Sequence, residues 1–504
     1  MPGRLLPILA ISTLLLTVTY FILSRQAVTS KAQPQLAALE YAAFPPEQHS
    51  NFTIDVDILK QFTDLPGTFE YQRYCVLAKE SPKLRRESVV GFKEDFLDEQ
   101  ATNEISLNDE ALFGQDSLFP ACRSSLTLEV PEFTSREHKD TKSLMLGVAT
   151  TLKRIEQSLP NLSRWLSNTG SQLVVLLVDQ PEIDNTNENI IRIDDLASNL
   201  AISLILEPYV PASRHDSEGM KNFGLATALD KHQREETKWF GVIDDDTFFF
   251  SLSRMVEHLA PYDHQQQWYI GALTEGHTRV AREGFKAWGG AGFFISPPLM
   301  RILAKNSEQC MSLGKKFGDI LWRDCILQVT SPTVRLTEMK GLNQLDLWND
   351  VSGWYEAGFD PILTVHHWKS WHYFPIAASH LVTDVAGTDS LLQRYLFGNN
   401  TVFTNGYSIV QYPRGIPDLN LVELTMTEDK YVRRPPGSLE FHHSFGKTRP
   451  ALEAGTEKIS WRFEYAMKTE DGTVRQFYVR RTWRDPNGDG PVESIVEVDW
   501  RHVQ

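Results

Sequence analysis

One stretch of the chain decides the fold: Trp239-Phe240-Gly241-Val242-Ile243-Asp244-Asp245-Asp246-Thr247. Its first five residues form an apolar run without polar alternation, which is typical of a strand buried on both faces of a parallel sheet. Three adjacent carboxylates follow this strand at its carboxyl end, the edge where ligands of open α/β sheets bind. The stretch therefore predicts an α/β domain with an acidic site at the end of one strand.

The sequence before this stretch predicts more of the same domain. Apolar runs predict strands at residues 144–150, 173–178 and 200–206, and apolar periodicity predicts helices at residues 152–168, interrupted at Pro160, and 221–231. A strand, a crossover helix and a second strand make a βαβ unit with parallel strands. We therefore expect a parallel sheet whose strands end at one shared edge.

The Asp triplet favours a metal site. On an extended backbone, residues i and i+2 point to the same side, so Asp244 and Asp246 can converge while Asp245 turns away. Adjacent carboxylates repel one another unless a cation compensates them, and Mn²⁺ or Mg²⁺ prefers oxygen ligands and can bridge to a diphosphate. The alternative is an acidic turn that caps a helix beginning near Ser251.

A glycine-rich segment follows the triplet. Residues 268–271, Trp-Tyr-Ile-Gly, predict a short strand, and residues 288–296 are Trp-Gly-Gly-Ala-Gly-Phe-Phe-Ile-Ser. Glycines at positions 289, 290 and 292 let the backbone approach a ligand closely. Such a cluster alone is also typical of a bulge, but its place after an Asp triplet favours a ligand-binding loop.

Together these motifs resemble the Fringe-like branch of glycosyltransferase family 31. The resemblance rests on Ala149-Thr150-Thr151, Trp239-Phe240 before the triplet, Tyr269-Ile270-Gly271, Gly289-Gly290-Ala291-Gly292-Phe293 and Val365-His366-His367. It covers about residues 142–395 and implies a GT-A fold, a Rossmann-like α/β domain for nucleotide-diphospho-sugars. It further implies β-1,3-type transfer from a UDP-sugar donor, a divalent metal and an inverting single displacement.

The resemblance assigns the metal ligands by position. It implies Asp246 as the direct ligand, with Asp244 also at the metal and Asp244 or Asp245 nearer the nucleotide ribose. His366 resembles a late metal-binding histidine of the family, and His367 is the fallback. A neutral imidazole can join carboxylates around Mn²⁺. The alternative for the histidine pair is a partly buried aromatic cluster.

An inverting transfer also needs a base that takes the proton of the acceptor hydroxyl. The family places an acidic residue for this purpose after the glycine motif, usually in an Asp-Asp pair, and here that pair is broken. Alignment on Cys325-Ile326 implies Asp319 as the base, with Asp324 as the alternative. Asp319 follows a glycine, so a helix N-cap is an equally typical role for it.

Further donor contacts are predicted at the strand ends, ahead of the triplet and in the glycine motif. The predicted residues are Thr150, Thr151, Arg154, Asp179, Lys221, Gly289, Gly290, Ala291 and Gly292. The first four follow two neighbouring strands at the edge where a uridine diphosphate would lie. Lys221 resembles a basic residue found ahead of the triplet in relatives, and a solvated helix residue is its alternative role.

Composition limits the partners. The chain has 504 residues, with 50 Lys and Arg against 65 Asp and Glu, a net charge of −15 and 41% apolar residues. It is too long for one compact unit and too apolar for wholesale disorder. Because nucleic-acid-binding proteins need a basic face, the negative charge argues against a nucleic-acid partner.

The first residues predict a membrane anchor. Residues 5–23 are uncharged and lie between Arg4 and Arg25, and as a helix they would span roughly 28 Å of bilayer. A cleaved signal peptide usually has a shorter apolar stretch and a small-residue cleavage site, so we favour a type II signal anchor. The body of the protein is then expected in the lumen of the Golgi apparatus or endoplasmic reticulum.

A luminal body would be oxidised and glycosylated. Four cysteines permit three pairings, and sequence proximity favours Cys75 with Cys122 and Cys310 with Cys325, with four buried thiols as the alternative. N-glycosylation sequons occur at Asn51, Asn161 and Asn399.

We therefore expect six regions. They are a cytoplasmic tail (1–4), a transmembrane anchor (5–23), a stem (24–60), an accessory region (61–135), a GT-A domain (136–398) and a β-rich C-terminal region (399–504). The expected function is transfer of a hexose or N-acetylhexosamine from a UDP-sugar to a glycan or glycoprotein acceptor. The alternatives are a catalytically inactive glycan-binding membrane protein and an adhesion module that depends on the β-rich tail.

Overall fold

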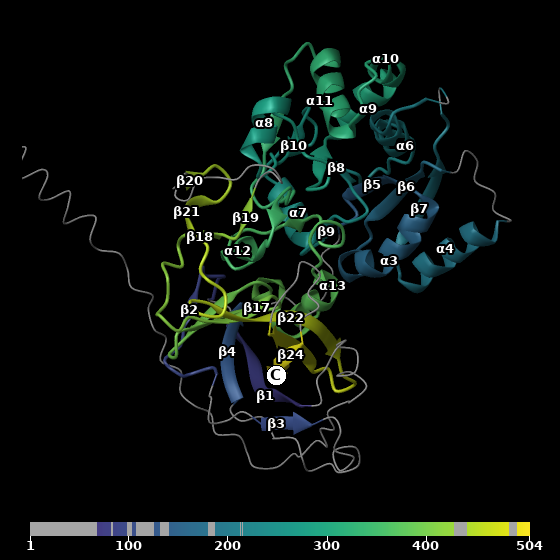
Figure 1. The fold of residues 1–504 in the computed structure, drawn as a ribbon. Helices are drawn as coiled ribbons and strands as arrows, with labels where there is room; N and C mark the ends of the chain where they lie inside the picture. The colour runs from purple at the N-terminus through teal and green to yellow at the C-terminus, as the bar shows by residue number, and fades with distance from the viewer. Residues whose placement is uncertain are drawn as a thin grey trace, which may run out of the picture.

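The computed structural model describes residues 68–81, 84–97, 103–106, 125–131, 141–179, 187–211, 213, 215–427, 441–482 and 491–503. It contains two large sheets, an α/β part in the upper half of Figure 1 and a β-rich part in the lower half. The predicted anchor and stem lie outside the described residues. Within the described ranges, no helix combines the length and the apolar character that a membrane crossing requires.

The α/β part is built on a seven-stranded sheet. In spatial order its strands are β12 (Leu336–Glu338), β10 (Tyr269–Gly271), β11 (Phe293–Ile295), β8 (Trp239–Ile243), β5 (Leu144–Thr150), β6 (Gln172–Leu177) and β7 (Ser203–Pro208). All neighbouring strands are parallel except that β11 runs antiparallel to both β8 and β10. The α/β class is therefore confirmed, with the third predicted strand lying a few residues later than expected.

The strand order creates a switch point at the centre of the sheet. From β5 the chain moves outward to β6 and β7, and then returns to place β8 on the opposite side of β5. The connections after β5 and β8 therefore lead to strands on opposite sides of the sheet, to β6 and to β10. In open α/β sheets this is where ligands bind, outside the carboxyl ends of the strands.

Helices cover both faces of this sheet. They are α3 (Leu152–Leu166), α4 (Glu188–Asn199) and α7 (Leu252–Leu259) on one face, and α5 (Glu218–Phe223), α6 (Leu225–Lys231), α9 (Pro297–Lys305) and α11 (Gly318–Val329) on the other. Alternate residues of β5 serve the two layers, because Leu144 and Leu146 pack with α3 while Met145 packs with α6. This explains the continuous apolar runs, since every position of these strands is covered.

Two helix predictions were wrong in detail. Pro160 does not interrupt α3, because the apolar face of the helix, including Leu159 and Leu162, stays packed on the sheet. The single helix expected at residues 221–231 is divided at Gly224 into α5 and α6. A side chain at Gly224 would come within 3.1 Å of Leu176 and Tyr209, so the backbone approaches the sheet closely there.

The β-rich part is a ten-stranded sheet. Its order is β2 (Val90–Gly91), β15 (Arg394–Phe397), β16 (Thr401–Thr404), β17 (Ser408–Gln411), β22 (Ile459–Lys468), β23 (Val474–Arg481), β24 (Val492–Val503), β1 (Thr68–Ser81) and β3 (Asn103–Ser106), with β4 (Ser125–Pro131) also paired to β1. Strands β15 to β17 and β22 to β24 are antiparallel.

The ten-stranded sheet joins distant parts of the sequence. Strand β1 pairs in parallel with β24 over ten residue pairs, from Glu70 opposite Ser494 to Lys79 opposite Val503. The regions expected separately at residues 61–135 and 399–504 thus contribute to one sheet. One continuous apolar core includes Val76 and Trp500 from this sheet and Leu146 from the α/β sheet.

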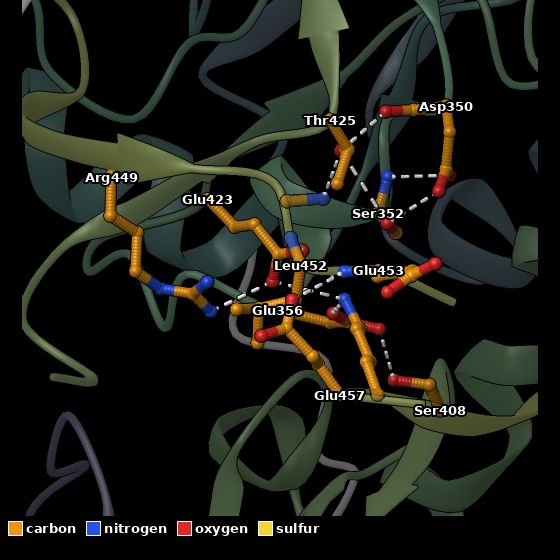
Figure 2. A network of polar contacts seen from close by, with 12 residues as sticks. Asp350, Ser352, Glu356, Ser408, Glu423, Thr425, Arg449, Leu452, Glu453 and Glu457 are labelled. Carbon is orange, nitrogen blue, oxygen red and sulfur yellow. Dashed lines mark hydrogen bonds and ion pairs between the residues drawn. The ribbon is translucent and has the colours of Figure 1, made fainter. Parts of the chain in front are cut away.

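A buried polar network also connects the two parts (Figure 2). Glu423 in β18 (Val422–Leu424) accepts hydrogen bonds from Arg449 at 2.7 Å, from Lys458 at 3.2 Å and from the backbone of Leu452 at 3.0 Å. Lys458 also pairs with Glu356 at 2.6 Å, directly after α12 (Ser352–Tyr355). The tail is therefore attached to the α/β part by buried charges as well as apolar contacts.

The predicted disulfide between Cys310 and Cys325 is confirmed. It links α10 (Ser307–Met311) to α11, and both sulfur-bearing residues are fully buried. The other predicted pairing stays a prediction, because Cys122 lies outside the described residues.

Candidate functional site

The Asp triplet lies at the switch point, in the turn between β8 and β9 (Phe248–Phe249). The Thr247 hydroxyl accepts the backbone N–H of Asp244 at 2.9 Å and donates to the Gly290 carbonyl at 2.8 Å. Helix α7 has its own cap, Ser251, whose side chain accepts the N–H of Arg254. The triplet is therefore free of a capping role and is tied to the glycine motif.

Strand pairing brings His366 to the triplet. Strand β14 (Thr364–Val365) pairs antiparallel with β9, with Val365 opposite Phe248, so the residue after β14 reaches the turn before β9. His366 Nε2 lies 3.0 Å from Asp246 Oδ1, and both side chains are almost completely buried. His366 Nδ1 donates to the Gln344 carbonyl at 3.2 Å, which fixes the ring with Nε2 facing the carboxylates.

The Asp246–His366 pair shifts both pKa values. Burial opposes the charge on each group, but the hydrogen bond and the attraction between them outweigh it. The pKa of His366 is thereby raised to about 9, and the pKa of Asp246 is held below its usual range. The pair is consequently charged at neutral pH in the metal-free protein.

Asp244 is the more open carboxylate of the site. Its Oδ2 lies 3.5 Å from His366 Nε2, and 44% of its side chain is exposed. Partial desolvation, together with the neighbouring Asp246, Asp245 and Asp319, raises its pKa to about 6 against the effect of His366. Asp244 thus offers a carboxylate at the open side of a buried ion pair.

These donors fit a hard divalent cation. Ligand atoms of Asp246, His366 and His367 lie within 4.8 Å of one another. His367 has both ring nitrogens engaged, with Asp346 at 3.0 Å and Ser370 at 2.9 Å, whereas His366 Nε2 faces only carboxylates. Carboxylate oxygens with one imidazole nitrogen suit Mn²⁺, and the contacts favour Asp244 over His367 as the third ligand.

The glycine motif shapes the site around His366. Gly290 lies against the imidazole so closely that a Cβ atom there would overlap the ring. The Ala291 N–H donates to Gln344 Oε1 at 2.8 Å, and the Ala291 carbonyl accepts from Thr364 at 2.7 Å. Gly292 has a φ of +82°, which favours glycine. At this motif the structure shows how the loop supports His366, while contact with a donor stays a prediction.

Asp245 points the other way, toward the start of α3. Its carboxylate accepts from the Thr150 hydroxyl and from Arg154 Nη2 at 2.6 Å, and Lys369 Nζ lies 3.4 Å away. Lys369 also donates to the Asp245 carbonyl at 3.1 Å and to Ser158 at 2.7 Å. Two of the predicted donor residues, Thr150 and Arg154, therefore meet the triplet through Asp245.

Thr151 and Asp179 both cap α3. The Thr151 side chain accepts the N–H of Arg154 at 3.4 Å, and Asp179 accepts the N–H of Leu152 at 3.1 Å. Both residues lie at the predicted edge, but these contacts are sufficient to explain them structurally. Lys221 pairs with Glu218 at 2.7 Å on α5, which agrees with the alternative role of a solvated helix residue.

The structure separates the two base candidates. Asp319 lies in the first turn of α11, two residues after the Phe317 cap, and its charge acts on Asp244. It forms an ion pair with Lys286, whose ammonium group is buried and lies 3.3 Å from the Trp288 ring centre. Asp324 instead pairs with Arg323 at 2.8 Å. The geometry thus favours Asp319 near the triplet.

Sequence reasoning missed several residues of this site. Lys286, Lys369, Gln344 and Asp346 all contact predicted site residues. Lys286 lies two residues before Trp288 and Lys369 three residues after His366, so their proximity to the motifs was the signal that could have found them. Gln344 and Asp346 carry no such local signal.

Two family models match this part of the chain. The model described as Fringe-like matches residues 213–330, which include the triplet, the glycine motif and Asp319. The model described as protein of unknown function DUF604 matches residues 282–390, which include His366. The comparison with curated proteins finds no match.

Solved structures show a distant likeness. The mannosyltransferase PcManGT from Pyrobaculum calidifontis, in complex with GDP-Man and Mn²⁺, is 13% identical over 48% of this chain and 62% of its own, with a TM-score of 0.27. Mouse xyloside xylosyltransferase 1 is 11% identical over 45% and 92%, with a TM-score of 0.26. The galactosyltransferase LgtC, in complex with donor and acceptor sugar analogues, is 10% identical over 46% and 81%, with a TM-score of 0.28. Likeness at this level carries no argument about the site.

The match to the Fringe-like model is therefore the evidence for the family resemblance. It covers three of the five motifs from which the resemblance was predicted: Trp239-Phe240 before the triplet, Tyr269-Ile270-Gly271 and the glycine motif. Over residues 213–330, this chain is similar to the Fringe-like family.

Proposed function

We propose that this protein is a metal-dependent glycosyltransferase that moves a hexose or N-acetylhexosamine from a UDP-sugar to a glycan or glycoprotein acceptor. The observation that carries the proposal is the contact of His366 Nε2 with Asp246, and more distantly with Asp244, at the sheet's switch point. A buried imidazole beside two carboxylates, which themselves lie in the segment that matches the Fringe-like model, is a donor set suited to Mn²⁺ or Mg²⁺.

Different residues are proposed to bind the metal ion and the phosphates of the donor. Asp246, His366 and Asp244 would hold the ion, which when bound supplies positive charge to the departing diphosphate. Asp245 holds Arg154 and Lys369, at 2.6 Å and 3.4 Å, and these two cations lie beside the amino-terminus of α3. Positive groups at a helix amino-terminus support binding of a phosphorylated ligand at this edge.

Asp319 is the proposed base of an inverting, β-1,3-type transfer. It would accept the proton of the acceptor hydroxyl as that oxygen attacks the donor's sugar carbon. The Lys286 ammonium group keeps the Asp319 carboxylate positioned, and Lys286 in turn is stacked on Trp288 at the start of the glycine motif. The Lys286 cation engages an oxygen of the Asp319 carboxylate that a base would need for the acceptor's proton. The same ion pair therefore also fits the alternative of an inactive, glycan-binding protein.

We further propose a single-pass type II location in the Golgi or endoplasmic reticulum, with this site in the lumen. The support is the uncharged segment at residues 5–23 and the disulfide between Cys310 and Cys325, since disulfides persist in oxidising compartments. Localisation of a fluorescently tagged full chain, with protease protection of the tag at each end, tests this part.

A donor screen tests the chemistry. Purified protein is incubated with UDP-galactose, UDP-glucose and UDP-N-acetylglucosamine, with and without Mn²⁺, and release of UDP is measured. We expect Mn²⁺-dependent hydrolysis of one donor, its loss in Asp246→Ala, and retained UDP binding without transfer in Asp319→Asn. Absence of hydrolysis with every donor, together with binding of glycans, would instead support the inactive glycan-binding protein.

A further inference from the structure

A cavity lies next to the segment that pairs with Asp319 through Lys286. It has a volume of about 640 Å³ and is formed by α11 together with strands β10 and β12 at the edge of the α/β sheet. This volume is within the range of small-molecule pockets. None of the predicted donor or metal residues lines it.

A residue that lines the cavity is adjacent in sequence to the ion-pair partner of the proposed base. Phe285 lines the cavity, and the next residue, Lys286, forms the ion pair with Asp319. Tyr269 forms another part of the wall, and its hydroxyl accepts the N–H of Ala287 at 2.8 Å. A ligand in the cavity would therefore touch the segment that positions the base.

The charges around the cavity balance. Arg323 and Asp324 pair with each other at 2.8 Å. Arg335 and Glu338 are exposed on the rim, carry opposite signs, and have no ion pair or hydrogen bond among the side chains that the structure describes. A cavity without net charge favours a neutral ligand over a phosphorylated or acidic one.

The remaining wall is apolar. Leu327, Val334 and Leu336 line it, and Phe285 at the rim is 72% exposed, which is unusual for a phenylalanine. An exposed aromatic ring beside an apolar cavity is typical of a binding site, because its burial by a ligand is favourable.

We propose that this cavity binds the apolar aglycone of a neutral glycoside acceptor and so directs the acceptor's sugar to Asp319. The proposal rests on the proposed function, since it names the acceptor class for the same site. The aglycone would be an alkyl or aryl group that covers Phe285 and Leu336.

Paired acceptors test this proposal. Methyl and octyl β-glycosides of galactose, glucose and N-acetylglucosamine, used below the micellar concentration of the octyl compounds, share the sugar and differ in the aglycone. With the active UDP-sugar and Mn²⁺, we expect the octyl compound of one pair to have a KM on the order of tenfold lower than its methyl partner. Phe285→Ala should abolish most of this difference, and Phe285→Tyr should keep it.

The control removes a comparable exposed apolar side chain elsewhere. Val210, after β7, is 74% exposed and lies on the opposite edge of the sheet, so Val210→Ala should keep the difference. Equal KM values within every pair, with transfer intact, would overturn the proposal. An octyl advantage that survives in Phe285→Ala would overturn it as well.

Failure of the proposed function gives a different result. Donor hydrolysis with water as acceptor does not involve the aglycone. If no donor is hydrolysed, the proposed transferase activity is contradicted, and binding to the cavity is then measured by calorimetry. Binding of the octyl glycosides that is lost in Phe285→Ala then supports the aglycone site, and no binding of any octyl glycoside overturns it.

Discussion

Gly290 supports the His366 ring directly, since a Cβ atom at Gly290 would lie within 3.0 Å of three atoms of the imidazole. This contact joins the glycine motif to the histidine of the candidate metal site. The two residues are 76 positions apart in the sequence, and the β14–β9 pairing brings them together. The absence of a side chain at Gly290 is therefore needed for the position of the histidine ring.

We predict that Gly290→Ala displaces His366 and weakens Mn²⁺ binding by at least about tenfold, because supporting contacts of a metal-bound histidine typically contribute that much. Calorimetric titration of the metal-free protein with Mn²⁺ measures the change. Gly276→Ala is the control, since a Cβ atom there meets nothing closer than 3.6 Å. Equal Mn²⁺ affinity in Gly290→Ala and wild type would contradict the assignment of His366.

Mn²⁺ affinity should rise with pH. The pKa of His366 is about 9 in the metal-free protein, so at pH 7 a proton occupies the nitrogen that the ion requires. Binding must release this proton, and affinity should increase about tenfold per pH unit until pH approaches 9. Calorimetry in buffers of different ionisation enthalpy measures the number of protons released at pH 7, and we expect about one. No release would show that His366 is neutral or not a ligand.

Asp246→Asn should change this pH dependence. Without this carboxylate, only the charges of Asp244 and Asp346 still oppose the effect of burial on His366, so its pKa falls and less proton release is expected. Overall Mn²⁺ affinity should still fall, because an oxygen ligand of negative charge is lost. The histidine's pKa can be followed by NMR of the imidazole protons, which separates a missing ligand from a misfolded variant.

A buried glutamate should make stability depend on pH. Glu275 is 3% exposed, and burial, with a smaller contribution from Asp346, raises its pKa to about 8. The folded state therefore keeps a proton that the unfolded state loses near pH 4.5, so stability declines as pH rises from about 4.5 through 8. The loss attributable to Glu275 is at most ~5 kcal/mol.

Glu275→Gln removes that titration. Between pH 5 and pH 8.5, the free energy of unfolding should decline less in the variant than in wild type, as measured by urea denaturation followed by tryptophan fluorescence. Glu308→Gln, at an exposed position of α10, should behave as wild type. If Glu275→Gln and wild type decline in parallel, another group is responsible.

Loss of Glu423 should destabilise the whole chain. In Glu423→Gln, Arg449 and Lys458 lose a carboxylate that is 3% exposed, and breaking a buried ion pair typically costs about 3–5 kcal/mol. Glu457→Gln is the matched control, because Glu457 pairs with the exposed Arg414 and such pairs contribute about 0–1 kcal/mol. Thermal unfolding measures both, and similar values for the two variants would contradict the role of the network.

The central strands and the acidic site could be predicted because their signals are local. The run before Asp244 is apolar at every position, and the strand is covered on both faces, so composition alone indicates its burial. The Asp triplet follows directly, which fixes its place at the strand end. The histidine of the site depended on the family resemblance, because nothing near His366 distinguishes a metal ligand from an aromatic cluster.

Other features depend on contacts that no local pattern contains. Lys286 and Asp319 are separated by 33 positions, and only the packing of α11 brings the charges together. Pro160 carries the usual signal for a helix end, yet the buried face of α3 outweighs it. The β-rich C-terminal region was predicted, but its pairing with β1 could not be. The paired residues are more than four hundred positions apart, and no local pattern specifies such a register.

The pairing of β1 with β24 also has a consequence for biosynthesis. During translation, Thr68–Ser81 emerges long before Val492–Val503, so β1 lacks its longest neighbour until almost the whole chain has left the ribosome. Contacts of such sequence separation slow folding, and an unpaired strand edge invites association with other chains. A ribosome-stalled chain that stops at residue 482 should therefore recruit chaperones and resist native folding, although its candidate active site is already synthesised.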